Sequence, residues 1–228
     1  MKLLMIDTSS VVATAAVIDE HSLIGEIIIN HEKKHSEKLM TAVDHLLKDA
    51  RLTIRDMDAF GIVQGPGSFT GLRIGMATVK GLAQALDKPV VGVSALASLA
   101  ANIPYAGGIV CPILDAQRHR VYTGLFRNDP NNGQEQILPD SEMTIDALIE
   151  TLSRYQDQPV IILGDAKDKF FDELKAQLPN CIAAADHLSM NRASSAAYLG
   201  MQKLLRGETE THLSIAPTYL RASYAEEK

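Results

Sequence analysis

Cysteine is scarce in this chain, which has Cys111 and Cys181 and no others in 228 residues. So few cysteines exclude a disulfide framework and are typical of a protein that works in a reducing compartment. Long apolar runs are also missing, since runs such as residues 27–29 and 109–113 fall far short of a membrane span. Asp7 interrupts the stretch where the apolar part of a secretory signal would continue. We therefore expect a cytoplasmic protein with no membrane contact.

Positive charge is in short supply as well. Lys and Arg number 22 against 28 Asp and Glu, so the net charge at pH 7 is -6. A protein that binds nucleic acid by itself normally shows a basic stripe, because phosphate neutralisation supplies most of the affinity. The longest basic cluster, Arg118-His119-Arg120, is too small for that. Any role in nucleic-acid metabolism is expected to run through a partner.

The chain does contain a repeated order of predicted elements. In the first half, apolar β-branched runs and helical spacing predict strands at 3–7, 13–19 and 23–30, a helix at 36–50 with Ser36 as N-cap, a strand at 60–64, a helix at 68–86, a strand at 90–93 and a helix at 95–101. In the second half, the same signals predict strands at 109–114, 121–127 and 134–138, a helix at 144–154, a strand at 160–163 and helices at 168–178 and 194–205.

The segment 102–108 is rich in Gly and Pro and breaks this pattern, which predicts two domains, 1–104 and 105–228. Each half opens with a strand that ends in an acid, Asp7 or Asp115, just before a tight hairpin. This repetition of the same element order predicts an α/β protein with a duplicated fold of the ribonuclease H or actin-like kind, built from two mixed-sheet halves. The same order argues against a Rossmann domain, because the parallel sheet of that fold needs a helix after every strand.

A glycine-rich segment, residues 65–75, joins a predicted strand to a predicted helix and reads GPGSFTGLRIG. It lacks the Gly-Lys-Ser/Thr of a phosphate-binding Walker loop, and Thr70 stands where a dinucleotide fingerprint has its third Gly. Two interpretations stay open. The helix N-terminus could bind an anion, or the segment could be a tight turn with close helix packing.

The helix that follows has more than one apolar face. Its two stripes are Leu72, Met76, Val79, Ala83 and Leu86, and Ile74, Ala77, Gly81 and Ala85. Such a helix must be buried on more than one side. Glycines within a helix each cost about 1 kcal/mol relative to Ala, so we expect another backbone to pack closely against them. The second face is covered either by the helix at 39–50 or by a partner protein.

The acids that end the two opening strands, Asp7 and Asp115, form a candidate pair. In an actin-like fold the opening hairpins face one another and embrace the phosphates of a nucleotide, with acids holding Mg²⁺. The alternative is that each Asp caps its own hairpin by accepting nearby N–H bonds. A glycine pair for the adenosine is missing, since the strand at 160–163 is followed by Gly164 and then Asp165. This favours a degenerate cleft.

Residues 31–35 read HEKKH and match a zinc-protease pattern, but we expect a polar loop here, because helical spacing begins only after Ser36. Cys111 lies inside an apolar strand and is expected to be a structural thiol. No Ser-His-Asp order is visible among the scattered histidines, so a nucleophilic enzyme is not supported. We therefore predict no catalytic residues and no metal site.

Several motifs together resemble one family. They are residues 5–9 (MIDTS), His35-Ser36 before a helix, the GPGSFTGLRIG string, residues 112–116 (PILDA) with Val121-Tyr122, and residues 217–221 (PTYLR). In this order, over nearly the whole chain, they resemble the TsaB (YeaZ) family. One departure lies at Arg118-His119, where relatives more often have Arg then Gly, so no role is carried over to that turn.

The resemblance implies an actin-like fold and a role in forming N6-threonylcarbamoyladenosine at position 37 of tRNAs that read codons starting with A. It implies a non-catalytic scaffold and activator, with catalysis by a metal-binding paralogue, TsaD. An ATPase, TsaE, joins the pair, and family members pair with TsaD or with themselves. The chain is expected to have no cofactor of its own, with ATP or ADP and Mg²⁺ only within the complex, and to meet tRNA only through that complex. The alternatives are an actin-like ATPase or kinase and, less favoured, a zinc peptidase.

The family pairs through its first two helices, which implies an interface on this chain. The residues assigned to that partner or dimer interface are His35, Leu39, Val43, Leu46, Gly71, Arg73, Ile74, Ala77 and Gly81. The residues assigned to the degenerate nucleotide cleft are Asp7, Thr8, Gly67, Ser68 and Asp115.

Overall fold

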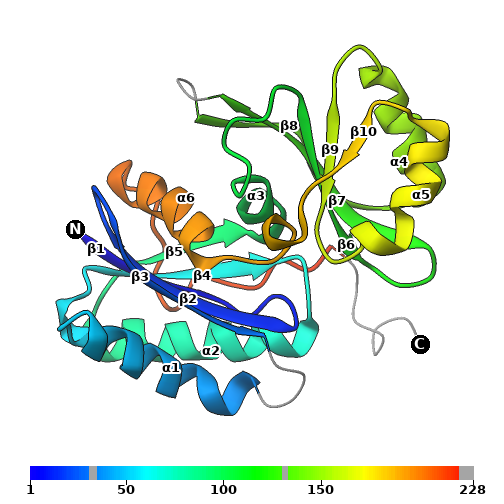
Figure 1. Ribbon diagram of the computed structural model, residues 1–228. Coiled ribbons are helices and arrows are strands. Elements are labelled where there is room, and N and C mark those ends of the chain that lie inside the picture. The colour runs from blue at the N-terminus through cyan, green and yellow to red at the C-terminus, as the bar shows by residue number, and fades with distance from the viewer. Residues whose placement is uncertain (31–34, 130–132, 221–228) are drawn as a thin grey trace. The chain divides into compact units, whose positions relative to one another are not determined.

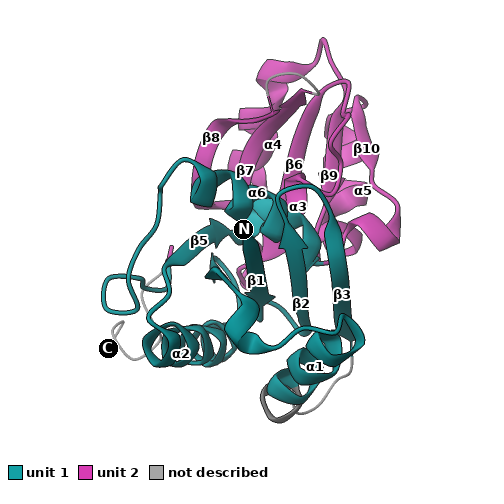
Figure 2. Ribbon diagram, turned by 90° about the vertical axis from the view of Figure 1, so that its left-hand side faces the viewer, with its two compact units in different colours: residues 1–98, 191–218 teal, residues 99–190, 219–228 magenta. Residues whose placement is uncertain are grey.

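The computed structural model describes residues 1–30, 35–129 and 133–220, and the side chains of residues 35–38 lie outside that description. The chain divides into two compact units (Figure 2). Unit 1 comprises residues 1–98 and 191–218, and unit 2 comprises residues 99–190 with the residues from 219 onward.

Unit 1 is built on a five-stranded mixed sheet in the order β3-β2-β1-β4-β5. Its strands are β1 (Lys2–Asp7), β2 (Val12–Asp19), β3 (Leu23–Asn30), β4 (Ala59–Gly65) and β5 (Val90–Ser94). The first three strands form an antiparallel meander, while β4 pairs with β1, and β5 with β4, in parallel. These strands agree with the predicted ones to within about two residues at each end, as strand signals generally allow.

Unit 2 repeats this topology with the order β8-β7-β6-β9-β10. Its strands are β6 (Ile109–Asp115), β7 (Arg120–Asp129), β8 (Gly133–Thr144), β9 (Val160–Leu163) and β10 (Cys181–Ala183). Again the opening meander is antiparallel, and β9 and β10 add in parallel. The predicted duplication of two mixed-sheet halves is therefore confirmed.

Helices cover both faces of the sheet in unit 1 (Figure 1). The helices α1 (His35–Asp49) and α2 (Phe69–Leu86) lie on one face, and α6 (Ala193–Leu205) lies on the other. The alternation along β1 explains this arrangement, because successive side chains point to opposite faces. Leu4 and Ile6 belong to the core beneath α1 and α2. Leu3 and Met5 face the other way, where their side chains lie against Gly200 of α6.

The division of the chain corrects the predicted domains, 1–104 and 105–228. The chain first passes from unit 1 to unit 2 after residue 98, inside α3 (Ala95–Ala100). Residues 191–218 then belong to unit 1 again. The physical reason is the second apolar face of the first sheet, which needs α6 as a cover. The contiguous half that the sequence suggests would leave that face exposed to water.

In unit 2, α4 (Ile145–Leu152) and α5 (Lys167–Gln177) pack on the sheet, and both cysteines are buried in the core they form. The prediction was incomplete here in two places: β8 extends to Thr144, beyond the predicted 138, and β10 was not predicted. Short 3-10 turns at Ile54–Asp56, Ser153–Tyr155 and Asp186–Leu188 complete the elements. Among the described residues, no helix is long and apolar enough to cross a bilayer.

Candidate functional site

Asp7 ends β1 and is completely buried, yet its carboxylate is well supplied with donors. Its Oδ1 accepts the backbone N–H of Ser9 at 2.8 Å and the Ser9 hydroxyl at 2.6 Å. Its Oδ2 accepts Nδ2 of Asn191 at 2.9 Å. Burial raises the pKa of Asp7 above its ordinary value, while the hydrogen bonds from Ser9 and Asn191 act in the opposite direction. The side chain thus fixes the β1–β2 turn from inside.

The same turn lies directly against the start of α2. The carbonyl of Ser9 accepts the N–H of Ser68 at 2.6 Å, and the Thr8 hydroxyl donates to the carbonyl of Gly71 at 2.7 Å. A Cβ on Gly71 would lie 2.0 Å from the Thr8 carbonyl oxygen, and one on Gly75 would lie 2.3 Å from Thr8 Oγ1. The expected close backbone approach is therefore confirmed for Gly71, whereas the close neighbours of Gly75 are the side chains of Thr8 and Ile62.

The glycine-rich segment thus has the geometry of its second interpretation, a tight turn with close packing. Ser68 caps α2 by accepting the N–H of Gly71 at 3.2 Å, and Gly67 lies against the carbonyl of Ser9. The structure brings together Asp7, Thr8, Gly67 and Ser68, the unit 1 residues of the predicted nucleotide cleft. They are linked through Ser9, which contacts Asp7, Gly67 and Ser68, and through Gly71, which contacts Thr8 and Ser68.

Asp115 repeats this arrangement in unit 2. Its Oδ1 accepts the N–H of Gln117 at 2.9 Å, as Asp7 does with Ser9, and its Oδ2 receives Nζ of Lys169 at 3.0 Å. Its own N–H donates to Asp165 Oδ1 at 2.9 Å, and burial raises the pKa of Asp165. Both acids therefore cap their own hairpins. They belong to different units, so their pairing across a cleft stays a prediction.

The turn after Asp115 has an unusual backbone. Gln117, Arg118 and His119 have φ angles of 64°, 52° and 61°, a left-handed run of three residues without a glycine. This is the place where the sequence departs from the family pattern. His119 Nε2 lies 3.2 Å from Glu173 Oε1 of α5, which ties the turn to the helix.

The outward side of α2 is the exposed surface that fits the predicted interface. Phe69 is 37% exposed, and the guanidinium of Arg73 lies 3.8 Å from the centre of its ring. Ile74 is partly exposed, and Ala77 and Gly81 are exposed. A Cβ on Gly81 would meet no atom of the described residues within 4 Å, so the expected close packing does not occur there among them. We call Phe69, Arg73, Ile74, Ala77 and Gly81 the outer face of α2.

The α1 side of the predicted interface needs correction. Leu39, Val43 and Leu46 are at most 8% exposed and pack in the core of unit 1, so they face their own sheet and cannot form a surface. Helical spacing shows that these residues share a side of the helix, but it does not show what lies opposite. The exposed side of α1 instead carries Met40, which is 42% exposed, with Asp44. The side chain of His35 lies outside the described residues.

Phe69 and Met40 are exposed residues that the sequence analysis missed. Phe69 stands inside the GPGSFTGLRIG string, and its place as the first residue of α2 could have suggested an outward position. Met40 is one position out of phase with Leu39 and Val43, which is the signal for the opposite side of a helix.

Two other predicted or candidate sites can be placed. The HEKKH pattern lies mostly at 31–34, outside the described residues, and the described part of the chain holds no cluster of three metal-ligating side chains. A cavity of about 390 Å³ in unit 2 is lined by Tyr105, Ala106, Gly107, Gly108, Arg127, Asn128, Asp129 and Gln158. Because this lining contains none of the predicted site residues, the cavity is separate from the predicted cleft.

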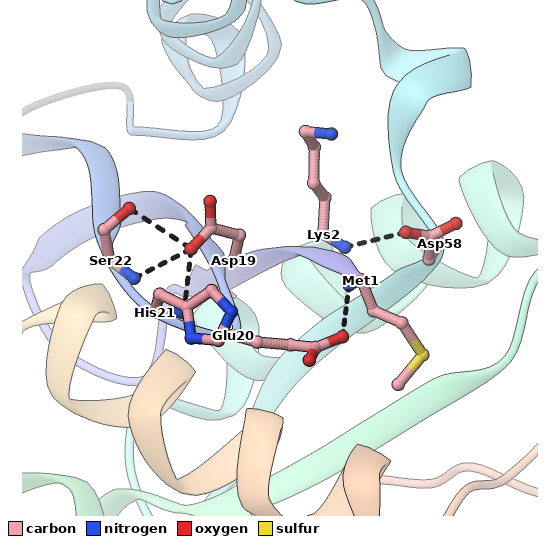
Figure 3. Close-up of polar contacts among 7 residues, drawn as sticks. All are labelled: Met1, Lys2, Asp19, Glu20, His21, Ser22 and Asp58. Atoms are coloured by element: carbon pink, nitrogen blue, oxygen red, sulfur yellow. Dashed lines mark hydrogen bonds and ion pairs between the residues drawn. The ribbon is translucent and has the colours of Figure 1, made fainter.

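Other acids make hydrogen bonds and an ion pair near the first residue of β1 (Figure 3). Asp19 accepts the N–H groups of His21 and Ser22, which lowers its pKa, and Asp58 accepts the N–H of Lys2. Glu20 pairs with the amino group of Met1 at 2.6 Å. These contacts hold the β2–β3 turn and the segment before β4 close to the start of β1. Asp7 differs from them because it is completely buried, as is its hydrogen bond with Asn191.

Comparison with known proteins gives consistent matches. A family model described as TsaD, tRNA N6-adenosine threonylcarbamoyltransferase, matches residues 22–228. The tRNA threonylcarbamoyladenosine biosynthesis protein TsaB of Bacillus subtilis is 36% identical over 231 residues, covering 100% of this chain and 97% of that protein.

Solved structures show the same fold. YeaZ from Pseudomonas aeruginosa superposes with a TM-score of 0.79 at 24% identity, covering 96% of this chain and 99% of that one. A ROK hexokinase from Thermus thermophilus superposes with a TM-score of 0.50 at 12% identity, covering 90% and 100%. With the duplicated sheet topology, these neighbours confirm the actin-like fold class.

Proposed function

Because this chain belongs to the TsaB (YeaZ) family, we propose that it serves in N6-threonylcarbamoyladenosine modification of tRNA as a non-catalytic subunit that pairs with TsaD. Its task in this proposal is to support and activate TsaD, with TsaE as a further partner. The free chain pairs with a second copy through the same surface. With a net charge of -6, the chain meets tRNA only through the complex.

The observation that carries the proposal is the outer face of α2. An exposed aromatic, a stacked arginine and small residues along one helix side are typical of the centre of a protein interface. Ala77 and Gly81 leave the backbone open, which allows another helix to approach closely. The revised interface consists of this face and the exposed side of α1 around Met40 and Asp44.

The buried position of Asp7 supports the non-catalytic role. A carboxylate that is to hold Mg²⁺ must offer free oxygen lone pairs to the ion. Asp7 is 0% exposed, and both of its oxygens accept hydrogen bonds from Ser9 and Asn191. Binding a metal–nucleotide there would break a network that fixes the β1–β2 turn. We therefore propose that nucleotide and Mg²⁺ enter only with the partner proteins.

The test is a change of charge on the outer face of α2. Ala77→Glu places a carboxylate on an exposed position without disturbing the core, so the fold should be retained. We expect the affinity for TsaD to fall by about tenfold or more, because a charge desolvated at an interface centre is costly. Size-exclusion chromatography with light scattering, followed by titration calorimetry, measures both the complex and the free chain's oligomeric state.

The matched control is Tyr198→Glu, which places the same charge on a 55% exposed position of α6, on the opposite face of the sheet. It should leave the affinity unchanged. Equal affinities for wild type and Ala77→Glu would show that α2 is not the contact surface. If the unaltered chain forms no complex with TsaD at all, the pairing itself is wrong.

A further inference from the structure

Asn191 is the first residue of the segment that returns to unit 1, and it is only 4% exposed. Its Nδ2 donates to Asp7 Oδ2 at 2.9 Å and to Ser9 Oγ at 3.0 Å, two groups that lie more than 180 positions away in the sequence. We infer that Asn191 is a positioning residue for the outer face of α2, acting through Asp7 and the turn at Thr8–Ser9. This inference rests on the proposed function of that face.

The first step is the connection from Asn191 to the turn. Ser9 has a hydroxyl that donates to Asp7 and accepts from Asn191, while its N–H also donates to Asp7. With both Nδ2 hydrogens of Asn191 engaged, the three side chains form a closed, buried network. Such networks specify one geometry, because any displaced member leaves a buried polar group without a partner.

The second step is the connection from the turn to α2. The Ser9 carbonyl accepts the N–H of Ser68 at 2.6 Å, immediately before the helix, and Thr8 donates to the Gly71 carbonyl within its first turn. Gly71 and Gly75 lie against Thr8, so that a single added methyl would overlap it. Because the β1–β2 turn and α2 are in direct contact with no space between them, a shift of the β1–β2 turn moves the first residues of α2.

The third step is the place of those turns in the proposed interface. Phe69, Arg73 and Ile74 all lie within two turns of the helix start, and Phe69 follows Ser68 directly. Their positions therefore depend on the same contacts that Thr8 and Ser9 make. Removal of the Asn191 amide leaves the Oδ2 of a buried carboxylate without its donor, which is costly enough to favour rearrangement of the turn.

The primary experiment compares Asn191→Ala with Ser194→Ala by amide hydrogen exchange on the full chain. Ser194 lies three residues after Asn191, in the first turn of α6, but its hydroxyl donates to Glu26 and not to the β1–β2 turn. We expect the amides of Ser68 and Gly71 to exchange about tenfold faster in Asn191→Ala, since one lost hydrogen bond to a charged group has that effect on local opening. In Ser194→Ala they should exchange as in the wild type.

A swap of the two side chains separates positioning from general destabilisation. Asn191→Asp alone sets two carboxylates against one another and should loosen Ser68 and Gly71 at least as much as Asn191→Ala. Combining it with Asp7→Asn restores one amide facing one carboxylate, with the net charge of the wild type. We expect this double variant to recover most of the protection and of the affinity for TsaD. A structural role without this directed pairing would make the two changes add instead.

The outcomes keep the inference apart from the proposed function. Faster exchange at Ser68 and Gly71 with an affinity for TsaD about tenfold lower supports the positioning role. If Ala77→Glu weakens binding while Asn191→Ala changes neither exchange nor affinity, the interface stands and the inference is overturned. If Asn191→Ala speeds exchange but Ala77→Glu leaves binding intact, the proposed interface fails, and with it the positioning role assigned to Asn191.

Discussion

At the scale of single residues, two glycines of α2 have opposite surroundings although they look alike in the sequence. Gly71 lies against the Thr8 carbonyl, where a Cβ would come within 2.0 Å, whereas Gly81 faces open space. Neither position has a left-handed backbone, so the neighbouring atoms alone decide what a methyl group costs there. The two positions therefore provide a matched pair for substitution.

We expect Gly71→Ala to lower the free energy of unfolding by about 1–3 kcal/mol, because the methyl forces the β1–β2 turn away from the helix. Gly81→Ala should raise it by up to about 1 kcal/mol, the gain in helix propensity at an exposed position. Urea denaturation followed by circular dichroism measures both. Equal effects of the two substitutions would contradict the close approach described for Gly71.

In the TsaD titration, Gly81→Ala should weaken binding if a partner helix uses the open space.

The sequence shows that glycines are unfavourable within this helix, so that each is expected to have a structural cause. It does not show which cause applies to Gly71 and which to Gly81. Helix propensity depends on the residue type, while the contact with Thr8 depends on a turn some sixty positions away along the chain. The roles of Asp7 and Asp115 were better determined. Capping by an Asp at the end of a strand uses N–H groups two residues on, and such local hydrogen bonds follow from nearby sequence.

At the scale of elements, α6 is capped from outside its own sequence. Arg192, the residue before the helix, makes no side-chain capping bond. Glu26 of β3 supplies it instead, since Oε1 accepts both the N–H and the hydroxyl of Ser194 at 2.8 Å, and Oε2 pairs with Arg192 at 2.9 Å. A carboxylate at a helix N-terminus also interacts favourably with the helix dipole.

Replacement of Glu26 should therefore destabilise unit 1. We expect Glu26→Ala to cost about 1–3 kcal/mol, because it leaves the first-turn N–H of Ser194 and the charge of Arg192 without this partner. Glu26→Gln should retain part of the stability, since one amide oxygen still accepts. The exposed Glu150→Ala on α4 serves as control, with an effect within about 0.5 kcal/mol. Thermal and urea unfolding would refute the capping role if Glu26→Ala matched this control.

Most elements were predictable because their signals are local. Apolar runs rich in β-branched residues gave the strands of the opening meanders, and helical spacing gave α1, α2 and α6 nearly to the residue. β10 was not predicted because a strand of three residues is too short to show a recognisable pattern. Its pairing with β9 also depends on a neighbour distant in sequence. The inward side of α1 was assigned wrongly for a related reason. Leu39 and Val43 share a side by spacing, but only the folded sheet shows that it covers this side.

At the scale of the whole molecule, unit 1 is discontinuous, and this has a direct test. A fragment of residues 1–98 lacks α6 and leaves Leu3 and Met5 exposed, so we expect it not to fold. Joining residue 98 to residues 191–218 through a short Gly/Ser linker should restore a cooperative fold, since Ser98 Oγ lies 3.5 Å from the Arg192 carbonyl. Circular dichroism and the dispersion of amide NMR signals compare the two. A well-folded 1–98 fragment would contradict the need for α6.

The predicted boundary failed at this scale because order along the chain does not record where a segment returns. The duplicated topology was visible from the acids and strand order of each half. The destination of α6 was not, since its apolar pattern suits either sheet. Contacts in the folded chain assign it to unit 1, among them those of Gly200 with Met5 and Leu3 and of Ser194 with Glu26.

The two cysteines have a practical consequence of their own. Both are completely buried, both belong to unit 2, and burial raises the pKa of Cys111 to about 12, so its reactive thiolate is nearly absent in the folded chain. Alkylation should therefore proceed only through molecules in which unit 2 has opened. Since unit 1 has no thiol, the rate of alkylation reports the opening of unit 2 alone. Comparison of this alkylation rate with the rate of amide hydrogen exchange in unit 1 would show whether the two units unfold together.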